Sequence, residues 1–291
     1  MSLRMKILYN TLVGAWGGFV AWAILDIVLR LRPTNVWLDA VLNGAMVGMC
    51  VGTLVSSFGG LMAGRTILVA RGLSVGLLTG LGGGILGLLA GEAAFQSGRL
   101  ISESVLLREV IRAFGWAIFG IGIGVAEGLL TLSPRRFIYG GLGGVIGGFA
   151  GGVAFIAIVQ MSSLQLMNRA VGFALLGAFI GLFVGLVPVM LREAWLQVIS
   201  SGRNEGKEFL LDKRVNTIGS ADSNDVALFG DTTIAPKHAE IRQENGQFTL
   251  RVLKGQTVLV NNSPATNLVL QDGAQIRVGR VKLIFRRKGK A

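Results

Sequence analysis

The sequence contains very few of the side chains on which metal sites and nucleophilic catalysis depend. Its 291 residues include one cysteine, Cys50, and one histidine, His238. One cysteine cannot form an internal disulfide, and the two residues together cannot supply the ligands of a tetrahedral zinc site. Glycine-rich strings occur, but none leads into the Lys-Ser/Thr pair of a phosphate-binding loop. We therefore expect no enzyme activity, no bound metal and no cofactor.

Charged residues are also scarce, at 15% of the chain against about 25% in an ordinary soluble domain. Hydrophobic residues make up 52%, which excludes intrinsic disorder. The composition changes along the chain, since residues 196–291 hold 15 Lys/Arg and 9 Asp/Glu. This change predicts an apolar domain over residues 1–195, a linker over residues 196–206 and a polar domain over residues 207–291.

The apolar domain contains runs long enough to cross a membrane, for which about 20 helical residues are needed. Six such runs lie near residues 7–29, 36–63, 73–95, 113–132, 137–161 and 170–191. They predict an all-α six-helix transmembrane bundle. An even number of spans places both termini on one side, and the Arg135-Arg136 doublet favours the cytoplasmic side for both.

The spans share a recurring glycine pattern. Leu12, Gly14, Gly17 and Gly18 recur as Leu78, Gly80, Gly83 and Gly84, and again as Leu142, Gly144, Gly147 and Gly148. We interpret this as three repeated helical hairpins, although glycine-rich helices can also match by composition alone. Glycines four residues apart form one stripe that lets helices in lipid pack closely or form a homo-oligomer. The helix-packing positions expected on this basis are Gly80, Gly84, Gly120, Gly124, Gly177 and Gly181.

Few carboxylates fall inside these spans. Glu127 lies near the middle of the fourth span, where burying a charge is costly. It is either an ion or proton site or a neutral or paired carboxyl near the helix end. Asp26 and Glu92 lie near span ends, and we expect them at the membrane interface.

From about Lys207 the pattern changes to short alternating runs separated by turn residues, which predicts an all-β sandwich. Four motifs follow one another in this domain: "TIG" with "SNDVAL", then "KHAEI", "LVNN" and "LQDGAQIRVG". In this order and spacing they resemble a forkhead-associated (FHA) domain over residues 206–287. The resemblance implies an FHA-like β-sandwich that binds phosphothreonine peptides through loops at one end. By analogy, it also favours a bacterial inner-membrane protein.

The sequence departs from the FHA pattern at the phosphate-binding positions. Ser220 stands where the family has an arginine, and Ala235 stands where the family has a serine. His238, which braces the loop in the family, is present. The family's Asn-Gly turn corresponds to Asn261-Asn262, with Gln256 as another candidate. The candidate partner-binding residues are therefore Ser220, Asn224, Lys237, His238, Asn261 and Asn262.

These departures leave two modes of recognition open. A serine hydroxyl cannot replace the bidentate fork of arginine, which favours phosphate-independent protein contact. Lys213, Arg214 and Lys237 could still supply charge to a phosphopeptide. The basic tail "RRKGKA" is suited to anionic lipid headgroups, whereas no interleaved aromatic pattern supports nucleic-acid binding.

The sequence thus predicts a membrane-anchored adaptor or scaffold, whose cytoplasmic FHA-like domain binds a protein partner in signalling or complex assembly. The alternative is a channel or transporter that its FHA-like domain regulates. Against this alternative, the spans contain few of the convergent polar groups that a substrate path needs.

Overall fold

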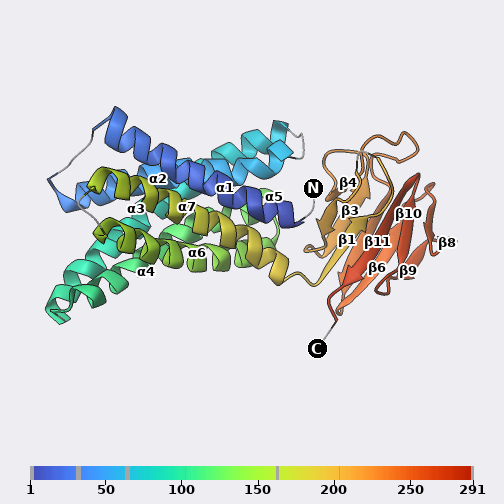
Figure 1. The fold of residues 1–291 in the computed structure, drawn as a ribbon. Helices are drawn as coiled ribbons and strands as arrows, with labels where there is room; N and C mark the ends of the chain where they lie inside the picture. Colours follow the sequence, from blue (N-terminus) through green and yellow to red (C-terminus); the bar gives the residue numbers. More distant parts are fainter. Residues whose placement is uncertain are drawn as a thin grey trace. The chain divides into compact units, whose positions relative to one another are not determined.

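The computed structural model describes residues 3–30, 34–62, 66–101, 103–161, 164–202 and 204–289. The chain divides into a helical unit over residues 4–190 and an all-β unit from Leu191 onward (Figure 1). The predicted fold class is confirmed for both units. Each unit is described by itself.

The helical unit is built from long apolar elements. Their bounds are α1 (Leu3–Trp22), the π-helix η1 (Ala23–Val28), α2 (Val36–Met62), α3 (Thr66–Ile101), α4 (Val105–Gly124), α5 (Ala126–Thr131), α6 (Pro134–Gln160) and α7 (Gln165–Met190). Within the described residues, six helical segments are long and apolar enough to cross a membrane. The first combines α1 with η1, and the fourth combines most of α4 with α5. The six predicted spans therefore correspond to helices.

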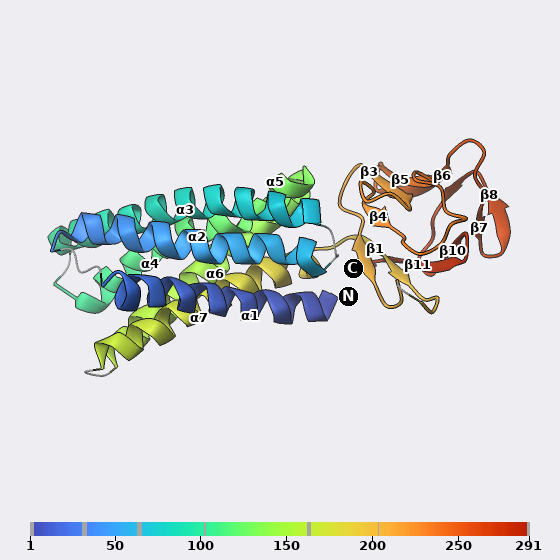
Figure 2. The same cartoon turned by 90° about the horizontal axis from the view of Figure 1, so that it is seen from above.

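Helix α1 packs against two neighbours through glycines on adjacent faces. A Cβ added at Gly14 would overlap the carbonyl oxygen of Gly177 on α7. A Cβ added at Gly17 would lie 2.9 Å from the Cα of Val51 on α2. Helices α1 and α7 accordingly run side by side in both views (Figures 1 and 2).

Helices α3 and α6 repeat this arrangement with the glycines that recur in the sequence. On α3, Gly80 lies against Gly48 of α2, and Gly83 lies against Gly122 of α4. On α6, Gly144 lies against Gly120 of α4, and Gly147 lies against Ile180 of α7. Each of α1, α3 and α6 thus lies between two of the helices α2, α4 and α7. The same contacts at three places support three repeated hairpins, α1–α2, α3–α4 and α6–α7.

All six predicted packing glycines lie against the backbone of a neighbouring helix. Gly80 and Gly84 face α2, Gly120 and Gly124 face α6, and Gly177 and Gly181 face α1. Side chains at these positions would separate the helices, which is the physical reason for glycine there.

Helices α2, α4 and α7 contact one another at the centre of the unit. Their facing side chains form one buried hydrophobic cluster. Val47, Phe119 and Leu176, one from each helix, are fully buried in it. The centre of the bundle is therefore filled with apolar side chains at this level.

The β unit is a sandwich of short strands. Their bounds are β1 (Ala194–Val198), β2 (Glu208–Leu210), β3 (Val215–Gly219), β4 (Val226–Ala227), β5 (Ala239–Glu244), β6 (Gln247–Val252), β7 (Val258–Val260), β8 (Ser263–Ala265), β9 (Asn267–Val269), β10 (Gln275–Val278) and β11 (Val281–Arg287). One sheet has the order β2-β1-β11-β10-β7-β8 and the other has the order β4-β3-β5-β6-β9. Side chains from both sheets, including Leu196, Ile241 and Phe285, form one buried core.

Strand β1 begins earlier than the sequence predicts, because Ala194–Val198 overlaps the end of the expected apolar domain and the expected linker. Ala194, Leu196 and Val198 alternate inward into the sandwich core, and the strand pairs with both β11 and β2. The residues just before β1 are also bound to the sandwich. Arg192 forms an ion pair with Glu208 at 2.9 Å, and the Glu193 carboxylate accepts a hydrogen bond from Gln243. Only a few residues therefore join the last span to the sandwich.

Candidate functional site

The candidate site lies at one end of the sandwich, where three loops meet. The loops follow β3, precede β5 and connect β6 to β7. Hydrogen bonds join them, because the Ser220 N–H donates to the Ala235 carbonyl at 3.0 Å and the Leu253 N–H donates to the His238 carbonyl at 3.1 Å. The start of β1 pairs with the end of β11, at the opposite end of the strands. The loops therefore lie away from the point at which the chain enters the sandwich.

His238 braces two of these loops from a buried position, with 3% of its surface exposed. Its Nδ1 accepts a hydrogen bond from the Ala235 N–H at 3.2 Å, and its Nε2 lies 3.1 Å from the Thr257 carbonyl oxygen. A backbone N–H can only donate and a carbonyl can only accept, so these two contacts fit a ring that accepts at Nδ1 and donates from Nε2. His238 therefore fixes loop geometry and does not present a ring nitrogen to a partner.

Asn224 has a similar internal role. Its side-chain amide donates to the carbonyls of Ala221 at 2.9 Å and Pro236 at 2.6 Å, and only 5% of the residue is exposed. Gly219 completes this contact, because an added Cβ would overlap the Pro236 carbonyl oxygen. Asn224 thus holds the two loops together, and its side chain is not available to a partner.

Ser220 and Lys237 are the predicted residues that remain accessible at this end. Ser220 is partly exposed and lies beside Ala235 through their backbone hydrogen bond. The Lys237 side chain is 54% exposed, and its Nζ lies 3.9 Å from Glu240 Oε2. An exposed point charge and a neutral hydroxyl offer hydrogen bonds to a partner but no bidentate fork.

The structure does not bring Asn261 and Asn262 to this end. They form the turn between β7 and β8 with φ values of 50° and 67°, and Asn261 Oδ1 accepts a hydrogen bond from the Gln275 N–H. Thr257, which contacts His238, lies at the other end of β7. The alternative candidate, Gln256, does lie in the loop beside Thr257, so it is the residue that joins Ser220 and Lys237.

Asp231 is a structural residue of the loop end that the sequence motifs did not include. Its carboxylate accepts hydrogen bonds from the Thr233 hydroxyl at 2.6 Å and the Arg280 N–H at 2.7 Å. These donors hold the pKa of Asp231 below its usual range. Asp231 therefore ties the loop before β5 to the turn between β10 and β11. The only local signal was the Asp-x-Thr spacing of an Asx turn.

In the helical unit, three carboxylates near span ends, Glu127, Asp26 and Glu92, form ion pairs. Glu127 contacts Lys6 at 2.5 Å and Arg136 at 3.6 Å. This geometry corresponds to a paired carboxyl near a helix end. Asp26 and Glu92, which we expect at the membrane interface, are buried within the protein, with 7% and 4% of each residue exposed. No group of His, Cys, Asp and Glu suited to a metal ion occurs in the part of the chain that the structure describes.

Comparisons with known proteins agree with this geometry. Residues 198–289 match the family described as "Inner membrane component of T3SS, cytoplasmic domain". Over 91 residues the chain is 34% identical to the glycogen accumulation regulator GarA of Mycobacterium tuberculosis, covering 31% of this chain and 56% of GarA. It is 35% identical to the oxoglutarate dehydrogenase inhibitor of Corynebacterium glutamicum, with 31% and 63% covered. The chain thus spans little more than half the length of these relatives.

A solved FHA domain, that of FhaA complexed with the intracellular domain of a second protein, is 30% identical. The match covers 32% of this chain and 99% of that one, with a TM-score of 0.29. The C-terminal unit is an FHA-like domain, which confirms the resemblance read from the sequence.

Proposed function

We propose that this protein is a membrane-anchored adaptor, whose FHA-like domain binds a protein partner through the loop end of the sandwich. The helical unit anchors the domain in the inner membrane, with both termini in the cytoplasm. The matched family supports this assignment, since its description places such a domain on the cytoplasmic side of an inner-membrane component.

The proposal depends on one combination of features: the loops are braced internally, and the side chains with which the FHA family binds phosphate are missing from them. His238 and Asn224 fix the loops internally, as a preorganised binding surface requires. Ser220 lacks the guanidinium fork of the arginine found at this position in phosphate-binding FHA domains, and Ala235 lacks the hydroxyl of the serine found there. The surface therefore suits recognition by shape, with Lys237 and Gln256 as polar contacts, and partner binding does not depend on a phosphate group.

The packing of the helical unit favours anchoring over conduction. Val47, Phe119 and Leu176 are fully buried where α2, α4 and α7 meet. Glu127, for which an ion or proton site is one of two readings of the sequence, is paired with Lys6 and Arg136. Ion conduction needs polar groups along the whole path. The apolar centre interrupts such a path, and the paired Glu127 carboxylate does not extend it.

Affinity purification of the full-length protein from membranes of its source tests this proposal. Lys237→Glu reverses the exposed charge at the loop end, whereas Gln247→Glu adds a charge at the exposed turn between β5 and β6, at the other end. We expect Lys237→Glu to lose a partner that the wild type and Gln247→Glu both retain. Equal retention by all three proteins would contradict the proposal.

A further inference from the structure

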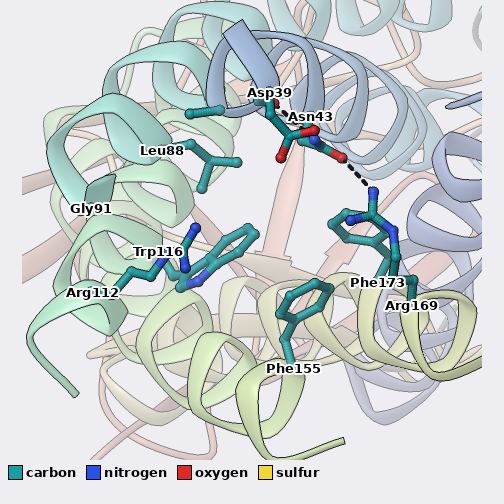
Figure 3. Close-up of a pocket in the computed structure, with 10 residues that line it drawn as sticks. Asp39, Asn43, Leu88, Gly91, Arg112, Trp116, Phe155, Arg169 and Phe173 are labelled. Atoms are coloured by element: carbon teal, nitrogen blue, oxygen red, sulfur yellow. Dashed lines mark hydrogen bonds between the residues drawn. The ribbon is translucent and has the colours of Figure 1, made fainter. Parts of the chain in front are cut away.

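A cavity of about 80 Å³ lies between α2, α3, α4, α6 and α7 (Figure 3). Its polar groups come from the first two turns of three candidate spans, so it lies at the end of the bundle where α2, α4 and α7 begin. One turn further along these helices, the fully buried Val47, Phe119 and Leu176 close its inner end. The cavity, called the vestibule below, is thus closed at its inner end, and residues of the helical unit line it.

Two arginines line the vestibule at equivalent positions of the repeat. Arg112 and Arg169 lie at the same sequence distance before the packing glycines Gly120 and Gly177. Ala40 occupies the third equivalent position, before Gly48, and it also lines the cavity. The pseudosymmetry of the bundle therefore brings two guanidinium groups together and leaves the third side without one.

Buried carboxylates hold both arginines. Arg169 Nε lies 3.2 Å from Asp26 Oδ1, and Arg112 Nη2 lies 3.0 Å from Glu92 Oε2. The side chains of the two carboxylates are 0% and 5% exposed. Arg169 also donates to Asn43 Oδ1 at 3.0 Å. Because a guanidinium has five N–H donors, each arginine retains donors beyond these contacts.

A third carboxylate points into the vestibule from the side that lacks an arginine (Figure 3). This is Asp39, in the first turn of α2. Among the described residues, the ion pairs next to the vestibule join Arg112 to Glu92 and Arg169 to Asp26, and none involves Asp39. Trp116 and Phe155 provide aromatic walls, which favour a cation over an anion.

We propose that this vestibule binds a small zwitterionic group that carries a primary ammonium and an oxyanion. The ammonium pairs with Asp39, and the oxyanion accepts hydrogen bonds from the remaining donors of Arg112 and Arg169. A simple anion would meet the Asp39 carboxylate, and a simple cation would leave the arginine donors unused. A free amino acid and the headgroup of an aminophospholipid share this chemistry.

Thermal unfolding of the purified full-length protein tests the proposal. In detergent, the unfolding temperature with glycine is compared with the unfolding temperatures with acetate and with methylamine, at equal ionic strength. In nanodiscs, phosphatidylethanolamine is compared with phosphatidylcholine, which lacks ammonium N–H donors, and with phosphatidylglycerol, which lacks the ammonium. Stabilisation by glycine identifies a soluble zwitterion as the ligand, and stabilisation by phosphatidylethanolamine alone identifies a lipid headgroup. No stabilisation in either series, or equal stabilisation by acetate, overturns the proposal.

Variants separate this site from general effects on folding. Asp39→Asn should weaken binding of the stabilising zwitterion by about tenfold or more, because a charged hydrogen bond is lost. Glu103→Gln, an exposed acid-to-amide change just before α4, should leave binding unchanged. Ala40→Leu should block the cavity without removing any charge. Unchanged binding in both Asp39→Asn and Ala40→Leu would also overturn the proposal.

Discussion

The backbone N–H of Ser220 donates to the carbonyl of Ala235 at 3.0 Å. This hydrogen bond places side by side the two positions at which phosphate-binding FHA domains carry an arginine and a serine. If the resemblance to the family holds at these positions, the loops have the arrangement of a phosphate site without the side chains that bind phosphate. A gain of function should follow from restoring them.

The double variant Ser220→Arg with Ala235→Ser should acquire selectivity for a phosphothreonine peptide over its unphosphorylated form. Arginine contributes a bidentate charge-assisted contact, so we expect a preference of about tenfold or more. Calorimetric titration of wild type and variant with both peptides measures it. Ser220→Lys with Ala235→Ser is the matched control, since lysine supplies the charge without the fork. Equal binding of the two peptides by the arginine variant would show that the loop positions are wrongly assigned.

His238→Ala should loosen the loop end without unfolding the sandwich core. The change removes the acceptor of the Ala235 N–H and the donor to the Thr257 carbonyl. These hydrogen bonds are partly buried, and the loss of one typically costs about 0.5–1.5 kcal/mol. Hydrogen exchange should therefore accelerate at Ala235 and in the loop that contains Thr257, while the amides of β10 and β11 remain protected. Unchanged exchange at Ala235 would contradict the bracing role.

Asp231 should make the same loops sensitive to acid. The pKa of Asp231 is lowered in the folded protein. Its ionised carboxylate therefore stabilises the fold at pH values above the ordinary pKa of aspartate, and this stabilisation is lost as the pH falls through the folded pKa. Hydrogen exchange around Thr233 and Arg280 should increase as the pH is lowered from 6 towards 3, after correction for intrinsic rates. Asp231→Asn should remove this dependence. A variant with the wild-type pH profile would mean that other groups cause it.

Gly80→Ala should destabilise the helical unit, whereas Gly82→Ala on the same helix should not. A Cβ at Gly80 would overlap the Gly48 carbonyl oxygen, and a Cβ at Gly82 meets nothing within 4 Å. Overpacking of this kind costs about 1–3 kcal/mol, while alanine in an open helical position is favoured over glycine. Thermal unfolding in detergent compares the two variants. Equal unfolding temperatures would contradict close glycine packing.

The glycine contacts could be predicted from the sequence because they depend on spacing along each helix. Gly80 and Gly84 recur four residues apart, and this interval fixes which face they share. The pairing of Arg169 with Asp26 could not be predicted in this way. It joins the sixth span to the first, and no local periodicity specifies which distant side chains meet. For this reason the sequence offered no sign of the vestibule.

The loop end was predicted in part. The motifs that surround His238 and Ser220 assigned both to the loop end, where the structure places them, and their part in partner binding stays a prediction. Asn261-Asn262 was aligned with the wrong turn, since two asparagines in the left-handed region are typical of any tight hairpin. Strand β1 was missed because "AWLQV" directly follows an apolar span, and composition alone does not separate the two.

The central claim, partner binding at the loop end without a phosphate group, is tested most directly by site-specific photo-crosslinking in membranes. A photoreactive residue at position 237 should capture a protein partner, and the same residue at position 247 should not. Phosphatase treatment of the membranes before irradiation should leave the product at position 237 unchanged. Loss of that product after phosphatase treatment, or capture only at position 247, would contradict the account.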